Sequence, residues 1–508
     1  MTKPLDPLIE ALPLRYPGPG GAIAVLRDGA VLARHAWGFA NAELRISFTP
    51  QTLVRLCSVT KQFTCGLMLD AFPDPSVLDA EIRARLPLLQ AEAPTALDLC
   101  HNQSGLRDYW AVAMLHGAPA ESAFGDAETA RVIGATRTLQ FAPGTSYSYV
   151  NQNFRILSDI LQDRTGRSFA ELLRTRIFAP AGMATAFVAA DTRAMPDGTE
   201  GYEGTQATGF RPALNRIVWT GDAGIGASLD DMIAWERLID ATRDDPASLH
   251  ARLSAPVTFR DGTPAQYGFG LGRRTVQGRA VIGHGGALRG WRTHRLYVPS
   301  ERVSVIVLFN HSGDAGGAAS ELLGALLDDA PPPAAEPLPA PAWLGTYLEP
   351  ETGLVARATA AGGKVRLQYG QSPELLDVLP DGSAGTAATR LVPDGASLRM
   401  ERPAENRRSQ LEPIADGPVT KSPGRYRCDE LDALLTIQDA GNALYGGFSG
   451  FLGHGRMELL NPVGPDLWTL PCPRALDCAP PGDWTLQFHG AAVQVGCWLA
   501  RGLEYRRV

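Results

Sequence analysis

The sequence lacks any apolar run of the roughly 20 residues that a membrane-spanning helix needs. Its first residues, MTKPLDPLIEALPLRYPGPGG, mix Asp6 and Glu10 with prolines, and no apolar segment among them suits an export signal. We therefore expect a cytoplasmic protein with no membrane partner.

Cysteine pairs with metal-binding spacing are also missing. The seven cysteines form an odd set with no CxxC motif and no His/Cys pattern suited to zinc, so we expect free thiols, no metal and no cofactor. The formal charge of -7 would repel nucleic acid or an anionic membrane surface. A cationic substrate is mildly favoured by the same charge.

At 508 residues the chain is too long for a single core. Residues 1–330 alternate strand-like and helix-like stretches, which predicts an α/β domain. Asp28-Gly29 lies between two alternating apolar runs, as in a two-residue hairpin. Residues 302–310 read as a buried strand, and 318–330 read as a closing amphipathic helix.

A proline-rich segment at 331–343 predicts an extended linker. Beyond it, short alternating runs broken by Gly, Asp and Pro are typical of antiparallel β domains. A G-x-Y-x-x-x-E pattern occurs at 345–351 and again 79 residues later at 424–430. We therefore predict two related β domains, 344–417 and 418–508.

Lysine is rare, with four residues (Lys3, Lys61, Lys364, Lys421) against 43 arginines. Lys61 follows Ser58 by three residues where a strand-like run gives way to a helix, so the amine can reach the hydroxyl. A desolvated lysine can lose its proton at neutral pH, whereas arginine cannot. The pair predicts a serine nucleophile and its base; the alternative is an ordinary surface lysine.

Two further elements carry candidate chemistry. PGTSYSYVN (143–151) contains Tyr149, a phenol that an ammonium would help to ionise for proton transfer, and Asn151, which can hold the lysine or a substrate amide. The alternative is a polar turn before a helix.

The last element, His284-Gly285-Gly286-Ala287, lets a substrate backbone approach a strand, and the Ala287 N–H is a candidate oxyanion donor beside that of Ser58. A loop histidine beside glycines is the alternative interpretation. In this order, S-x-x-K, Y-x-N and a short basic-residue-Gly element form the pattern of β-lactamases and penicillin-binding proteins.

With NQSGLRDYW at 102–110, these elements resemble the S12 serine peptidases. Longer runs resemble the bacterial D-stereospecific aminopeptidases of that family: CSVTKQFTC, FRILSDI, RIFAPAGM, DAGIGASLDDMIAWE, GHGGALRGWR, ELDALLTI and VGCWLARGLEYRRV. The resemblance implies an α/β penicillin-binding-protein/β-lactamase-like catalytic domain, an antiparallel sheet flanked by helices, followed by two antiparallel β-barrel domains. It also implies a homodimer.

The resemblance assigns substrate recognition to a loop of the last domain, here PRALDCAPPGD (473–483), with Asp477 meeting the free α-ammonium of the substrate. Related carboxypeptidases have Lys and a following Ser or Thr where this chain has His284 and Ala287, so recognition of a carboxylate is weakened. Gly272 stands where we expect a polar amide side chain.

The expected activity is hydrolysis of the amide after an unblocked N-terminal D-residue, such as D-Ala in a short peptide or amide. Ser58 would form the acyl-enzyme as Lys61 takes its proton, and Tyr149, coupled to Lys61 and His284, would protonate the leaving amine. The alternatives are a β-lactamase, DD-carboxypeptidase or esterase on the same scaffold, or a non-catalytic penicillin-type sensor.

Overall fold

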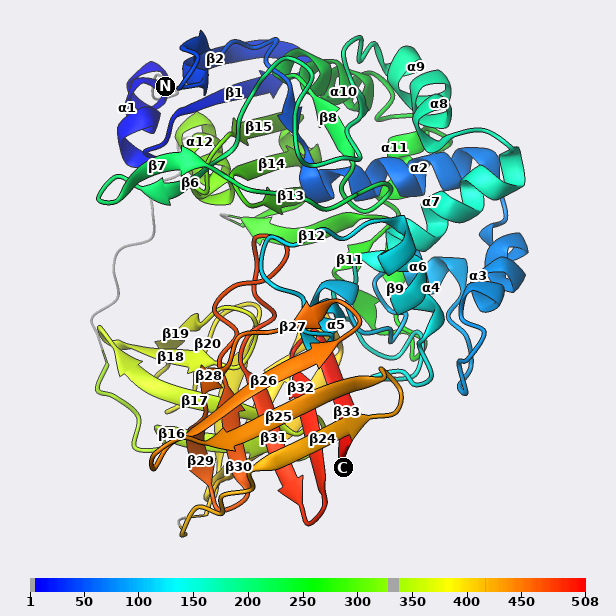
Figure 1. Cartoon of the computed structure of the whole chain (residues 1–508). Helices are drawn as coiled ribbons and strands as arrows, with labels where there is room; N and C mark the ends of the chain where they lie inside the picture. Colours follow the sequence, from blue (N-terminus) through cyan, green and yellow to red (C-terminus); the bar gives the residue numbers. More distant parts are fainter. Residues whose placement is uncertain (1–4, 277, 328–337, 416) are drawn as a thin grey trace.

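The computed structural model describes residues 5–276, 278–327, 338–415 and 417–508. An N-terminal region of sheet and helices (5–327) lies beside two β structures, which we call the barrel (β16–β23) and the C-terminal sheet (β24–β33) (Figure 1). No helix within the described ranges is both long and apolar enough to cross a membrane.

The N-terminal region is built on an eight-stranded sheet in which every neighbouring pair is antiparallel. In spatial order its strands are β11 (Tyr267–Gly268), β12 (Leu271–Val276), β13 (Arg279–Leu288), β14 (Trp291–Val298), β15 (Val303–Phe309), β1 (Gly20–Arg27), β2 (Ala30–Asn41) and β3 (Ile46–Ser47). The hairpin predicted at Asp28-Gly29 joins β1 to β2, and the buried strand predicted at 302–310 is β15; both predictions are confirmed.

Both faces of the sheet are covered, which explains why β15 and β1 consist almost entirely of apolar residues. Along β1, Ile23 and Val25 face α1 (Asp6–Arg15) and α12 (Ala315–Leu327), whereas Ala22 and Ala24 face the larger helical layer. The closing helix predicted at 318–330 is therefore confirmed but begins at Ala315; its residues 328–330 lie outside the described ranges.

The helical layer surrounds α2 (Thr60–Ala71), which is buried along nearly its whole length. The other helices of this layer are α3 (Asp79–Arg85), α4 (Ala96–Cys100), α5 (Tyr109–Leu115), α6 (Asp126–Gly134), α7 (Gln152–Thr165), α8 (Phe169–Leu173), α9 (Ala179–Ala181), α10 (Leu229–Ala241) and α11 (Leu249–Leu253). Phe63 of α2 packs on Trp235 of α10 with ring centroids 4.7 Å apart. Packing of this kind against the neighbouring helices holds α2 in place.

Short strands complete the N-terminal region. They are β4 (Val54–Arg55), β5 (Phe187–Val188), β6 (Tyr202–Thr205), β7 (Gly209–Pro212), β8 (Ile225–Ala227), β9 (Val257–Thr258) and β10 (Pro264–Ala265). The sheet β4-β8-β5 leads the chain into α2, and Leu56 N donates to Ile225 O at 2.9 Å. The pairing of β4 with β8 and the Leu56 hydrogen bond thereby fix the position at which α2 starts.

The first β structure is a closed eight-stranded barrel. Its strands are β16 (Gly345–Glu349), β17 (Leu354–Ala361), β18 (Lys364–Gln368), β19 (Glu374–Val378), β20 (Ala384–Gly385), β21 (Arg390–Asp394), β22 (Ser397–Arg402) and β23 (Arg407–Pro413). Pairing of β16 with β23 closes the barrel. The predicted linker at 331–343 lies in large part outside the described residues.

The C-terminal sheet has ten strands and stays open, as a half-barrel. They are β24 (Gly424–Cys428), β25 (Ala433–Asp439), β26 (Leu444–Gly450), β27 (Gly453–His454), β28 (Glu458–Leu459), β29 (Asn461–Gly464), β30 (Leu467–Leu470), β31 (Trp484–His489), β32 (Ala492–Cys497) and β33 (Ala500–Arg507). The predicted architecture of an α/β region followed by two barrel-type β structures is confirmed, with closure only in the first.

The repeated G-x-Y pattern has the same structural role twice. Tyr347 of β16 and Tyr426 of β24 each donate a hydrogen bond from the phenol to the backbone carbonyl four residues earlier, on Trp343 and Ser422 respectively. Each tyrosine thereby fixes the entry into the first strand of its β structure.

The glutamates that complete the two patterns differ. Glu351 is exposed, whereas Glu430 contacts the N-terminal region, accepting from Arg107 at 3.2 Å and from the Thr138 backbone and hydroxyl at 3.1 and 2.7 Å. Glu430 therefore joins the C-terminal sheet to the region that carries the helices.

Replacing Glu430 with alanine would leave the buried Arg107 guanidinium without its carboxylate. We expect Glu430→Ala to destabilise the protein by about 2–3 kcal/mol, because a buried charge that loses its partner keeps its desolvation cost. The change is read as a lower unfolding midpoint in urea. The control is Glu504→Ala, whose side chain is 55% exposed; equal midpoints for the two variants would contradict the prediction.

Candidate active site

Ser58 lies at the junction between β4 and α2, in the short helical turn η1 (Cys57–Val59). Cys57 adopts φ of +50°, a left-handed conformation that is uncommon for a non-glycine residue and is often found at functional sites. Its thiol is fully buried and directed toward the Arg55 carbonyl, and burial raises its pKa to about 12. The turn thus presents Ser58 while its neighbour packs inward.

The amine of Lys61 contacts three acceptors from three segments of the chain. Its Nζ donates to Ser58 Oγ at 3.0 Å, to Asn151 Oδ1 at 2.9 Å and to the Asp222 carbonyl at 2.8 Å. The residue has no exposed surface, and burial lowers its pKa to about 8, against the opposing effect of the nearby carboxylates. A substantial fraction of the amine is therefore neutral near pH 8.

Asp108 holds Asn151 in the orientation that faces Lys61. Its Oδ2 accepts from the backbone N–H of Asn151 at 2.7 Å and from its Nδ2 at 2.9 Å, which turns the amide oxygen toward the amine. Asp108 also caps α5 through Trp110 N at 3.0 Å. Burial raises the pKa of this carboxyl to about 6, with the Asn151 hydrogen bonds acting in the opposite direction.

Sequence reasoning singled out the segment 102–110 but not Asp108 within it. A helix-capping signal is visible, because an aspartate precedes the apolar run of α5. The contact with Asn151 is not visible, since it joins positions 43 residues apart.

Tyr149 lies over the same amine, with Lys61 Nζ 4.9 Å from its ring centroid. Burial raises the pKa of the phenol well above its ordinary value, and a hydrogen bond with Ser58 opposes this only in part. Its resting state is therefore the neutral phenol. The expectation that Tyr149 is easier to ionise here is therefore wrong, because burial, the largest effect on this phenol, raises its pKa.

His284 lies on β13, and its ring is 6.1 Å from that of Tyr149, centroid to centroid. Its Nε2 is 3.1 Å from the Tyr267 hydroxyl, and its Nδ1 contacts the Gly285 carbonyl. Burial lowers the pKa of His284 to about 3, so the ring is neutral. The structure thus places His284 beside Tyr149 through ring contact, with both nitrogens engaged elsewhere.

The glycines after His284 let β13 approach the turn that holds Ser58. A Cβ on Gly286 would lie 2.2 Å from Leu56 O and 2.3 Å from Thr293 Oγ1, so only glycine fits there. Strand β12 stops pairing with β13 at Gly283, which leaves residues 284–288 paired on one side only, with β14. On this unpaired edge of β13, Gly285, Gly286 and Ala287 line the same cavity as Ser58.

Gly272, where a polar amide was expected, lies opposite Gly283 at that end of β12. It lines a neighbouring cavity of about 290 Å³ together with Tyr149 and His284. A Cβ there would meet only the Gly283 carbonyl, at 3.5 Å, so the position has room for a side chain.

The loop predicted to recognise the substrate connects β30 to β31 and reaches from the C-terminal sheet into the N-terminal region (Figure 1). Asp477 on this loop is half-buried, and burial raises the pKa of its carboxyl to about 7, with the hydrogen bond from Ala479 N opposing the shift. Asp477 and Ser58 line the same cavity.

Arg289 fixes this loop, a role that the sequence did not reveal. Its Nη2 donates to the carbonyls of Ala475 at 2.6 Å and Asp477 at 2.8 Å. It lies in the turn that follows the His284–Ala287 element, but the loop that it holds is 186 residues away along the chain. Arg474, at the start of the loop, adds an ion pair with Glu121.

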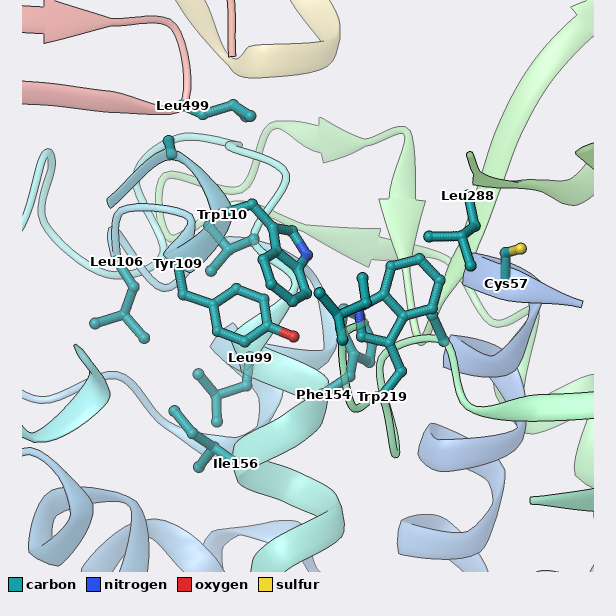
Figure 2. Packing of buried hydrophobic residues seen from close by; sticks show 14 of the residues in the cluster. Cys57, Leu99, Leu106, Tyr109, Trp110, Phe154, Ile156, Trp219, Leu288 and Leu499 are labelled. Carbon is teal, nitrogen blue, oxygen red and sulfur yellow. The ribbon is translucent and has the colours of Figure 1, made fainter. Parts of the chain in front are cut away.

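These residues surround one cavity of about 510 Å³, a size suited to a small molecule. Ser58, Tyr149, Asn151, Gly285, Gly286, Ala287 and Asp477 all line it. Trp110 and Trp219 form an apolar wall with ring centroids 6.1 Å apart, near Leu499 (Figure 2). Three lining carboxylates, Asp108, Asp314 and Asp477, outnumber the single arginine and favour a cationic ligand.

Comparison with known proteins agrees with this geometry. A family described as D-aminopeptidase, domain B, matches residues 337–506, and the β-lactamase family matches residues 5–328. The D-aminopeptidase of Gluconobacter oxydans (strain 621H) is 60% identical, over 99% of this chain and 98% of the relative. This chain belongs to the D-aminopeptidase family.

A second relative and a solved structure are also similar to this chain. The D-aminopeptidase of Brucella canis is 47% identical, over 99% of this chain and 98% of its own length. The octameric penicillin-binding protein homologue from Pyrococcus abyssi shares the fold at 20% sequence identity, with a TM-score of 0.54 over 88% of this chain and 98% of that one. The predicted family and fold are both confirmed.

The close approach of β13 to the Ser58 turn can be tested at Gly286. We expect Gly286→Ala to destabilise the protein by about 1–3 kcal/mol, because the added methyl group overlaps backbone and hydroxyl atoms that cannot move freely. The thermal unfolding midpoint measures this. The control is Gly134→Ala in α6, where a Cβ meets nothing within 4 Å; a Gly286→Ala protein as stable as that control would contradict the prediction.

Proposed function

We propose that this protein is a serine aminopeptidase that hydrolyses the amide bond after an unblocked N-terminal D-amino acid, as in D-Ala peptides and amides. The observation that carries the proposal is a single cavity that holds Ser58, hydrogen-bonded to the buried Lys61, and Asp477 from the loop of the C-terminal sheet. The names of the relatives support the D-stereochemistry.

In the proposed mechanism, Ser58 Oγ attacks the substrate carbonyl and Lys61 Nζ takes its proton across the 3.0 Å hydrogen bond. The neutral amine needed for this step is accessible because burial lowers the pKa of Lys61 to about 8. Asn151, held by Asp108, keeps the amine aligned with the serine. The step yields a tetrahedral intermediate and an ammonium on Lys61.

Collapse of the intermediate requires a proton for the departing amine. Tyr149, a neutral phenol beside both Ser58 and Lys61, is suited to pass the Lys61 proton to that nitrogen. His284 supports Tyr149 through ring contact rather than by carrying a proton itself. Water then attacks the acyl-enzyme by the reverse sequence of proton transfers.

The oxyanion of the intermediate is proposed to bind the backbone N–H groups of Ser58 and Ala287. Both residues line the cavity, and Ala287 lies in the part of β13 that pairs on one side only. Gly285 and Gly286 also line the cavity, and the absence of a side chain at Gly286 lets β13 lie against the turn that holds Ser58.

Recognition of the free amine is assigned to Asp477. Burial disfavours the charged form of the Asp477 carboxyl, and the ammonium group of a substrate would stabilise that form. The two opposite charges attract strongly in a site with little water. An acetylated amine offers no positive charge and would leave the carboxyl unpaired. Arg289 contributes by holding the loop backbone at Asp477.

Removal of the Asp477 carboxylate tests the proposal. With D-alaninamide, we expect Asp477→Ala to lower kcat/KM about 10²-fold or more, because the substrate ammonium loses its buried partner. The wild type should prefer D- over L-alaninamide. The control is Asp483→Ala, on the same loop but outside the Ser58 cavity.

A second comparison separates the alternatives on the same scaffold. The wild type should hydrolyse D-alanine p-nitroanilide far faster than its N-acetylated form or a penicillin. Equal turnover of the free and acetylated substrates would refute an aminopeptidase. Failure of an acylating inhibitor to label Ser58 would favour the non-catalytic sensor.

The state of Lys61 predicts a pH dependence. The rate at which the uncharged reagent phenylmethylsulfonyl fluoride labels Ser58 should rise with pH and reach half its maximum near the Lys61 pKa of about 8, because only the neutral amine accepts the serine proton. Mass spectrometry of the labelled protein gives the rate. Asp483→Ala, outside the Ser58 cavity, should keep the same midpoint, whereas a midpoint near 10.5, the ordinary lysine value, would contradict the assignment.

We further propose the division 1–330, 331–343, 344–417 and 418–508 as domain, linker and two β domains, which the separate sheets support. The homodimer and the cytoplasmic location stay predictions from the resemblance and from the composition of the first residues.

A further inference from the structure

A second large cavity, of about 600 Å³, lies where the N-terminal region, the barrel and the C-terminal sheet meet. It shares no lining residue with the Ser58 cavity. Its charged lining consists of four arginines and one carboxylate, namely Arg107, Arg407, Arg408, Arg501 and Glu351. In a protein of formal charge -7, this concentration of positive charge needs a physical explanation.

Arg501 is the unusual member of this set. It is 4% exposed, and its Nε donates to Gln140 Oε1 at 3.0 Å. Neither Nη1 nor Nη2 has a hydrogen-bond or ion-pair partner among the residues that the structure describes, and Nη2 is fully buried. The guanidinium lies over the Phe141 ring, with Cζ 5.8 Å from the ring centroid, but its unpaired terminal N–H groups still carry part of the cost of leaving water.

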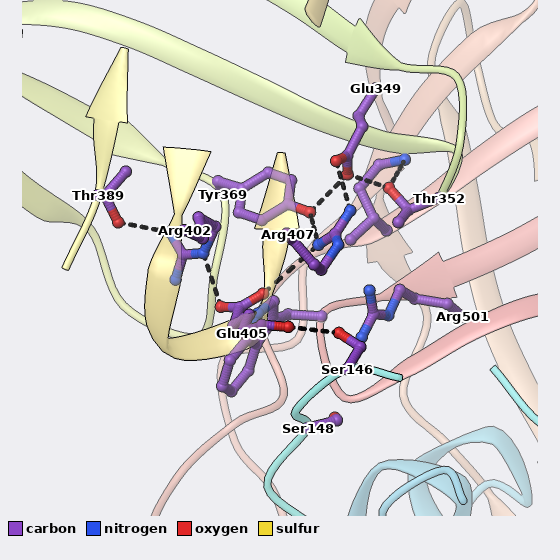
Figure 3. A network of polar contacts seen from close by, with 12 residues as sticks. Ser146, Ser148, Glu349, Thr352, Tyr369, Thr389, Arg402, Glu405, Arg407 and Arg501 are labelled. Carbon is purple, nitrogen blue, oxygen red and sulfur yellow. Dashed lines mark hydrogen bonds and ion pairs between the residues drawn. The ribbon is translucent and has the colours of Figure 1, made fainter. Parts of the chain in front are cut away.

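The neighbouring arginines do not share this deficit. Arg407 pairs with Glu349 and lies 3.4 Å from Glu405, and Arg107 pairs with Glu430 at 3.2 Å. Figure 3 shows Arg407 within a dense network of hydrogen bonds, while Arg501 lies beside that network with no bond to the residues drawn. The nearby carboxylates of Glu349, Glu405 and Glu430 therefore form their ion pairs with other arginines, and Arg501 forms none with the described residues.

Every other buried arginine in the described part of the chain has an acceptor on at least one terminal nitrogen. They are Arg55, Arg107, Arg155, Arg289, Arg295 and Arg402. Two buried arginines line this cavity, Arg107 and Arg501, and of these only Arg501 has no acceptor on a terminal nitrogen among the described residues.

We propose that this junction cavity binds an oxyanion and that Arg501 is its principal ligand. Because Nη2 of Arg501 is fully buried and Nε is hydrogen-bonded to Gln140, the anion would meet the Nη1 group, whose N–H groups can form charge-assisted hydrogen bonds to an oxygen of a phosphate or carboxylate group. Arg408, which also lines the cavity, has a 74% exposed side chain and only a 3.5 Å ion pair with Glu401, so its charge is also available. Two available guanidiniums favour a phosphate group over a single carboxylate.

The experiment measures binding of inorganic phosphate to the full chain by isothermal titration calorimetry. The wild type should bind one phosphate saturably, and Arg501→Gln should weaken this binding at least tenfold. The matched control is Arg506→Gln on the same strand, which removes the same charge from an exposed arginine paired with Glu504. It should bind phosphate as the wild type does.

Two further measurements keep the test decisive. Arg408→Gln changes an exposed side chain and should also weaken binding, which covers the case in which Arg501→Gln does not fold. Acetate at equal ionic strength distinguishes the sources of the oxyanion: tighter phosphate binding assigns the cavity to phosphate groups, whereas tighter acetate binding assigns it to carboxylates. Absence of saturable binding to either anion in the wild type, or undiminished binding in both variants, overturns the proposal.

Discussion

The burial of one amine organises the N-terminal region. Lys61 leaves water completely, which is costly for an ammonium, and its three donors are met by three acceptors. Because these acceptors come from the turn η1 before α2, from the segment before α7 and from the loop before β8, the folded arrangement of all three segments determines the state of the lysine. Asp222 is held in turn by the Tyr109 hydroxyl.

The same burial sets the balance of charge around the serine. Desolvation lowers the pKa of Lys61, while the carboxylates of Asp222 and Asp108 limit the shift, so the pKa settles at about 8. Burial raises the pKa of Tyr149 and lowers the pKa of His284. Both side chains are therefore neutral. Near pH 8 the site can therefore hold a neutral amine, a neutral phenol and a neutral imidazole together.

Local patterns in the sequence predicted the parts of this arrangement that depend on near neighbours. Ser58 and Lys61 meet because residues three apart share a helix face, and Asp28-Gly29 forms its hairpin for reasons contained in the dipeptide. Whether a β domain closes was not predictable, since it depends on pairing of the first and last strands: β16 pairs with β23, but the end strands of the C-terminal sheet do not meet.

Contacts across long stretches of chain were likewise beyond sequence reasoning. The bonds of Asp108 with Asn151, and of Arg289 with the loop at Asp477, join residues that nothing in their local sequence connects. The ionisation of Tyr149 was expected in the wrong direction, because the depth at which a residue is buried is a property of the whole fold.

The tip of the β32–β33 hairpin belongs to two parts of the molecule at once. Leu499 lines the Ser58 cavity and its carbonyl accepts from Asp108 N at 3.0 Å, while the Arg501 carbonyl accepts from Arg107 Nε at 2.7 Å. Since a ribosome makes the chain from its N-terminus, Ser58 emerges hundreds of residues before this tip and before Asp477. A nascent chain would thus carry Ser58 and Lys61 long before Asp477 and Leu499 are made, so the cavity around the serine is completed last during synthesis.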